Sequence, residues 1–145
     1  MCIRDSTGLK ALLFDEQLEV RNAVSWSICR IVLSRTGSDI LCNEEITQKI
    51  VESFLKHTKL EQVKEEYFII YLLVAFKHLL AYDPGIKFCL GTGLTACLKQ
   101  LSSTKIYSNE SNNTIHQLSL GALSNISMNP FGKVECVKEK VIEHC

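Results

Sequence analysis

Three glycines recur at a nearly constant interval, and this repetition constrains the fold more than any other feature. Gly37, Gly85 and Gly132 lie 48 and 47 residues apart. Each is preceded by an apolar helical stretch, which predicts a tight turn at the glycine, and is followed by a shorter amphipathic helix. A period near 47 is typical of units built from two or three helices. One such unit cannot bury its own apolar face, so the pattern predicts a stack of units with one concave surface.

The sequence therefore predicts an all-α solenoid of about three repeats, at roughly 9–57, 58–103 and 104–145. We interpret residues 1–8 as a tail outside this domain, because Met1–Ser6 resembles translated sequencing-adaptor read-through. The chain stops inside a helical pattern, so we expect truncation at both ends. Apolar positions in 9–14 and 137–142 should then be exposed and favour self-association.

Local signals place several helices within this frame. Asn43 is suited to cap a helix that carries Glu44 and Glu45 in its first turn. Residues 63–82 are apolar on nearly every face, so we expect a central helix in which Tyr67–Phe76 is buried all round. The polar stretch 102–113 predicts a loop. Thr114 and Gln117 are spaced as a capping box, which predicts that the next helix begins there. We expect this helix to run to Met128.

Composition excludes several classes of function. The chain carries 16 basic and 16 acidic side chains, and a nucleic-acid-binding protein usually has a basic excess. The longest apolar run has ten residues, too few to span a bilayer. We therefore expect no nucleic-acid or membrane partner. No signal peptide is recognisable, which favours a cytoplasmic protein.

The seven cysteines favour a reduced, intracellular protein in which thiols serve as small core residues. None is spaced as CxxC, and no Cys/His cluster suggests a metal site. Cys89 and Cys97 are eight residues apart, but Gly91 and Gly93 should break any helix between them. We interpret both as core thiols; a redox or metal role is the alternative.

Several phrases in the chain resemble armadillo and HEAT repeats. Asp15, Val20, Arg21 and Ala23 resemble the opening of such a helix, and residues 26–31 resemble the armadillo W-A-L-x-N-I stretch. Residues 122–126 resemble that stretch with its asparagine intact, as Asn125. The resemblance covers about residues 9–145 and implies an armadillo/HEAT-type α-solenoid that binds other proteins.

A narrower resemblance points to cilia. Residues 9–22, 65–81, 98–103 and 120–137 are similar, in the same order, to the armadillo-repeat radial spoke head protein of cilia and flagella. This resemblance implies a structural role in the axoneme. A generic cytosolic adaptor, of the transport or phosphatase-regulating type, is the alternative. Arg30 and His78 stand where a regular asparagine ladder would continue, which argues against nuclear-cargo transport.

The candidate binding residues form one row in the glycine register. Arg30, His78 and Asn125 each lie seven residues before a repeat glycine, and Trp26 lies one turn before Arg30. In armadillo proteins this row lines the concave groove, where Arg, His and Asn can bind a partner's backbone or acidic side chains. The alternative interpretation is that these side chains merely solvate that face.

Nothing in the sequence points to catalysis. His78 has no second residue at ligand or acid–base spacing, and Gly91-Thr92-Gly93 lacks the rest of a phosphate-binding fingerprint. We expect no catalytic residues, no cofactor and no metal. An all-helical enzyme fragment is the remaining alternative, and no cluster of titratable residues favours it.

Overall fold

The computed structural model describes residues 8, 11–58 and 66–141, and every regular element in those ranges is a helix. The predicted all-α class is confirmed for this part of the chain. Residues 1–7 of the predicted tail lie outside the described residues, as do residues 59–65. The helices, in order, are α2 (Leu18–Val32), α3 (Arg35–Leu41), α4 (Glu44–Thr58), α5 (Glu66–Leu79), α6 (Asp83–Cys89), α7 (Leu94–Leu101), α8 (Asn109–Met128) and α9 (Pro130–Lys138).

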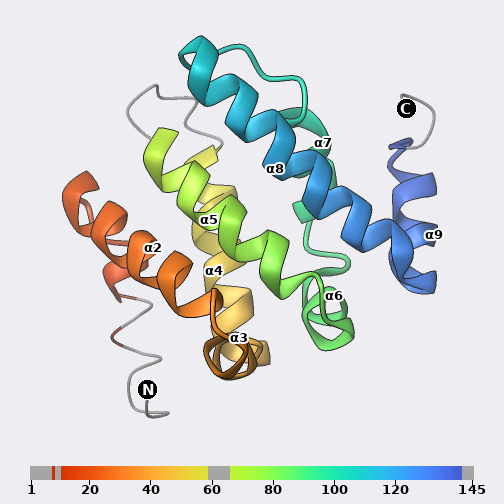
Figure 1. Cartoon of the computed structure of the whole chain (residues 1–145), viewed down its shortest axis with the longest axis horizontal. Helices are drawn as coiled ribbons and strands as arrows, with labels where there is room; N and C mark the ends of the chain where they lie inside the picture. Colours follow the sequence, from red (N-terminus) through yellow and green to blue (C-terminus); the bar gives the residue numbers. More distant parts are fainter. Residues whose placement is uncertain (1–7, 9–10, 59–65, 142–145) are drawn as a thin grey trace.

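Three long helices form one layer of the molecule. Figure 1 shows α2, α5 and α8 side by side, with α5 in the middle. Helices α4 and α7 lie behind this layer, and α4 contacts both α6 and α7. The short helices α3 and α6 each follow a long helix and precede a second-layer helix, whereas α9 follows α8. The order of elements therefore recurs along the chain.

Helix α5 forms the centre of the hydrophobic core. Seven of its side chains are completely buried: Phe68, Ile69, Leu72, Leu73, Ala75, Phe76 and Leu79. The Phe76 ring meets Phe54 of α4 edge-on, with ring centres 5.0 Å apart. The prediction that every face of 67–76 is buried is wrong for Tyr67, which is 55% exposed. Helices α2, α4 and α8 surround α5 but leave one face open, and Tyr67 directs its phenol there.

The repeat glycines lie in helices, not in the tight turns that the sequence predicted. Gly37, Gly85 and Gly132 are each the third residue of a short helix, α3, α6 and α9. A Cβ atom on any of them would overlap a carbonyl oxygen six residues earlier, at the end of the preceding long helix. The glycine is therefore required by the close approach of two helices, because none of the three has a positive φ. Proline at the first or second position of α6 and α9 begins a helix there instead of a turn.

Side-chain caps begin two of the other helices, α4 and α8. The predicted Asn43 cap is confirmed, since its Oδ1 accepts hydrogen bonds from Glu45 N at 3.0 Å and Ile46 N at 3.4 Å. The Thr114 capping box is wrong, because α8 begins five residues earlier, at Asn109. The Ser108 hydroxyl accepts from Ser111 N, and this cap outcompetes the later one. Residues 109–113 of the predicted loop 102–113 are therefore helical.

Candidate protein-binding groove

Helices α2 and α5 border an open groove of about 540 Å³ on the outer face of the long-helix layer. It is lined by Glu19, Asn22, Ala23, Trp26, Ser27, Tyr67 and Tyr71. The α2 residues belong to one helical stripe, since they recur at three- and four-residue intervals. Tyr67 and Tyr71 occupy successive turns of α5. We call this cavity the aromatic groove.

Three aromatic rings with polar atoms form its walls. Trp26 is 51% exposed and Tyr67 is 55% exposed, whereas Tyr71 is half-buried. The two tyrosine rings stack, with centres 6.4 Å apart and planes inclined by 27°. Large aromatic side chains with an accessible hydrogen-bonding atom are enriched where proteins bind each other. Their exposure here leaves apolar area available to a ligand.

Arg30 lies beside the groove and stacks on Trp26, which lines it. Its guanidinium carbon lies 5.6 Å from the centre of the Trp26 ring, a cation–π contact between residues one helical turn apart. The side chain is exposed and hydrogen-bonds to no residue in the described ranges. Stacking on the indole restricts the guanidinium without using its donors. Arg30 is therefore held beside the groove, and its guanidinium N–H donors are available to a ligand.

His78 lies on the same face of α5, seven residues after Tyr71. It is half-buried, and Nδ1 donates to the carbonyl oxygen of Val74 at 2.9 Å. A carbonyl can only accept, so this bond places a proton on Nδ1 and leaves Nε2 as an acceptor in the neutral ring. The structure thus adds an orienting hydrogen bond that the sequence did not predict.

Asn125, the third residue of the predicted row, also makes a hydrogen bond between two helices. Its Nδ2 donates to the carbonyl oxygen of Lys77 at 2.9 Å, which ties α8 to the last turn of α5. The amide oxygen makes no described hydrogen bond. Among the four candidate residues, the structure brings Trp26 and Arg30 into direct contact, and it places His78 on the neighbouring helix α5. Asn125 lies on the third helix of the layer, beside the residue that precedes His78.

Sequence reasoning missed Tyr67 and Tyr71. Both lie in an apolar run that favours complete burial. Their spacing of four residues was the available signal: within that run they are the residues with a hydroxyl group, and they fall on one side of the helix. Tyrosine tolerates a half-wet position that phenylalanine or isoleucine would not favour.

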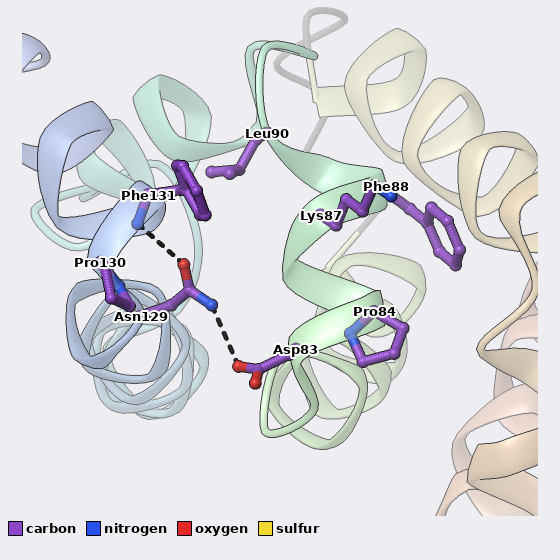
Figure 2. A pocket seen from close by; sticks show the side chains of 8 residues that line it. All are labelled: Asp83, Pro84, Lys87, Phe88, Leu90, Asn129, Pro130 and Phe131. Atoms are coloured by element: carbon purple, nitrogen blue, oxygen red, sulfur yellow. Dashed lines mark hydrogen bonds between the residues drawn. The ribbon is translucent and has the colours of Figure 1, made fainter.

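A larger cavity, of about 870 Å³, lies between α6 and α9. Figure 2 shows its lining residues, which are Asp83, Pro84, Lys87, Phe88, Leu90, Asn129, Pro130 and Phe131. Asn129 bridges its two sides: Nδ2 donates to Asp83 Oδ1 at 3.0 Å, and Oδ1 accepts from Phe131 N at 2.9 Å. The side chains of Asp83 and Asn129 therefore hydrogen-bond to each other, and Asn129 also caps α9. We therefore favour the aromatic groove as the binding site despite its smaller volume.

The environment of Cys89 disfavours the reactive thiolate form. Burial, together with smaller contributions from the nearby Cys42 and Glu135, raises the pKa of Cys89 to about 12. Cys89 is buried as predicted, but Cys97 is only half-buried, with Sγ 3.5 Å from Thr58 Oγ1. The predicted helix break between them is confirmed, since Gly91 and Gly93 adopt φ angles of 76° and 92°. Residues 8, 11–58 and 66–141 contain no group of three His, Cys, Asp or Glu side chains placed to hold a metal ion.

Comparisons of the chain with protein families, with curated proteins and with solved structures find no match. None of the described helices is long and apolar enough to cross a membrane.

Proposed function

We propose that this chain is an armadillo/HEAT-type α-solenoid and acts as a non-enzymatic scaffold that binds other proteins through the aromatic groove. The solenoid assignment is supported by the glycines at the third position of α3, α6 and α9, each against the end of a long helix. It is also supported by the layer that α2, α5 and α8 form. Stacked units of this kind present an extended surface suited to protein partners.

The observation that carries the binding site is the pairing of exposed aromatic rings with a pre-oriented arginine. Tyr, Trp and Arg are the residues that contribute most to binding energy at protein interfaces. Trp26, Tyr67 and Tyr71 supply apolar walls, and Arg30 supplies donors for a carboxylate or a backbone carbonyl. The groove therefore suits an extended peptide segment.

The charged residues at the two ends of the α2 stripe predict where a bound peptide carries charge. Glu19 lies at one end of the α2 stripe and Arg30 at the other. They are eleven residues apart, or roughly 16 Å along a helix. About five residues of an extended chain span this distance. We infer a ligand with a basic residue near Glu19, an acidic residue near Arg30, and an apolar or aromatic residue between them.

Selection from a random peptide display library tests this proposal. We expect enrichment of peptides that carry opposite charges about five positions apart, matching the groove length. Arg30→Ala should weaken such a peptide roughly tenfold, as for a loss of 1.4 kcal/mol. Lys138→Ala, a charge change at an exposed position on α9, is the matched control and should bind normally. Equal affinity of the Arg30→Ala variant would exclude the groove as the site.

The axonemal role rests on the sequence resemblance of residues 9–22, 65–81, 98–103 and 120–137 to the radial spoke head protein. It predicts that the full-length protein co-purifies with axonemal fractions of ciliated cells. Recovery only in the cytosolic fraction would favour a general adaptor with the same groove.

A further inference from the structure

The outer side of α8 is exposed where the equivalent sides of α2 and α5 are buried. Twelve residues before each repeat glycine stand Ser25, Leu73 and Leu120. Ser25 and Leu73 are completely buried, whereas Leu120 is 50% exposed. Helix α2 is followed in the layer by α5, and α5 by α8, but no described helix follows α8. Leu120 is thus an apolar side chain at a position that the next long helix covers elsewhere.

The opposite side of α2 shows the complementary situation. Ten residues before each repeat glycine stand Ser27, Ala75 and Ala122, all small. Ala75 and Ala122 are completely buried, but Ser27 is exposed, and its hydroxyl donates only to Ala23 O of its own helix. A small residue on one helix lets a larger side chain from the neighbour approach closely. Ser27 is therefore the exposed counterpart of two buried positions, and it also lines the edge of the aromatic groove.

Flanking positions on the same side of α2 support this equivalence. Val20 and Ile31 lie seven residues before and four residues after Ser27, and both are only partly buried. Their counterparts on α5 and α8 are fully or almost fully buried: Phe68, Leu79, Ile115 and Ile126. An apolar strip on α2 is thus left open, and no charged residue interrupts it at these positions.

We propose that α8 of one copy of this chain stacks on α2 of a second copy, as α5 stacks on α8 within the chain. Leu120 would lie against Ser27 of the neighbour. We call the exposed side of α8 that carries Leu120 the tail face, and the exposed side of α2 that carries Ser27 the head face. Because the two faces differ, the contact is head-to-tail, and an open chain of copies keeps one free face at each end. Such a contact generates open chains of copies or, if the rotation closes, rings.

Two single substitutions separate this arrangement from other modes of association. Leu120→Glu places a charge on the tail face, and Ser27→Arg fills the head face. Both positions are exposed, so folding should persist, as a thermal melt would verify. Gln100→Glu, an exposed position on α7 behind the layer, is the matched control.

Sedimentation velocity from low to high micromolar concentration gives the readout. The wild-type chain and the control should form a concentration-dependent series of species, and each blocked variant alone should remain monomeric. An equimolar mixture of the two variants should form dimers and nothing larger, since each retains one functional face. A wild-type monomer at every concentration would overturn the proposal, and so would a monomeric mixture. Association of Ser27→Arg as strong as in the wild type would also overturn it, because it indicates a symmetric tail-to-tail contact.

Discussion

Gly85→Ala provides a sharp test of why the repeat glycines recur. Helix propensity alone predicts that alanine stabilises a helical position by up to about 1 kcal/mol relative to glycine. The structure predicts the opposite sign. An added Cβ would lie closer than 3.0 Å to the Leu79 carbonyl oxygen, which is backbone and cannot rotate away. Helices α5 and α6 would have to separate, and that would also disturb the contact with Cys42, whose Sγ lies 3.5 Å from the new Cβ position.

The magnitude follows from known costs of overpacking. Forcing one methyl group into a packed site costs about 1–3 kcal/mol, and the site here offers only backbone to move. After the helix-propensity gain of up to about 1 kcal/mol is subtracted, we expect the free energy of unfolding to fall by up to about 2 kcal/mol. For a chain of this length that lowers Tm by about 2–4 °C per kcal/mol.

Urea or thermal unfolding followed by circular dichroism measures this change, and Gly121→Ala is the matched control. Gly121 lies inside α8, and an added Cβ there would lie 3.4 Å from Lys77 Cε and 3.6 Å from Lys77 Cδ, near the end of a flexible side chain. This variant should be as stable as the wild type or more stable by up to about 1 kcal/mol. A Gly85→Ala protein that gains stability to the same extent would refute the close-approach explanation.

Three further predictions concern the core, the groove and the thiols. Leu73→Ala should lower the free energy of unfolding by about 2–5 kcal/mol, because Leu73 is completely buried; chemical denaturation would reveal a smaller role if the loss stayed below about 0.5 kcal/mol. Asn125→Ala should cost about 0.5–1.5 kcal/mol, through loss of its bond to Lys77 O, whereas the exposed Arg30→Ala should leave stability nearly unchanged; equal melting curves for both would contradict this assignment. The pKa of Cys89 is about 12 in the folded protein, above its ordinary value of 9.0, so the stabilising contribution of this thiol is complete below pH 9 and is lost as pH rises toward 12; rapid alkylation of Cys89 in the native protein at pH 8 would show that it is not buried.

Helical periodicity was a reliable guide wherever one side of a helix faces the core. Helix α4 and its Asn43 cap were predictable, since the signal depends on neighbouring residues, Asn43, Glu44 and Glu45. The short helices α3, α6 and α9 were not, because Pro and Gly indicate a turn unless the neighbouring helix is known. The true role of their glycines depends on a carbonyl oxygen six residues away, which only the fold brings close.

The candidate site shows the same division. The register of Arg30, His78 and Asn125 followed from sequence, as did the proximity of Trp26 to Arg30. The contribution of Tyr67 did not, because the packing of α2, α4 and α8 around α5 decides which side of an apolar helix stays open. The bond from Asn125 to Lys77 was equally unpredictable, since the two residues are 48 positions apart.

Fluorescence of Trp26 tests the central claim most directly, because it is the one tryptophan in the chain and it forms a wall of the aromatic groove. In the free protein its 51% exposure should give red-shifted emission that acrylamide quenches readily. The Leu120→Glu background, whose changed residue lies on α8 outside the groove, removes any contribution from stacking of copies. Titration with a selected peptide or a purified partner should shift the emission to the blue and reduce quenching, with a midpoint equal to the independently measured Kd. Saturable binding that leaves Trp26 emission and quenching unchanged would contradict the account.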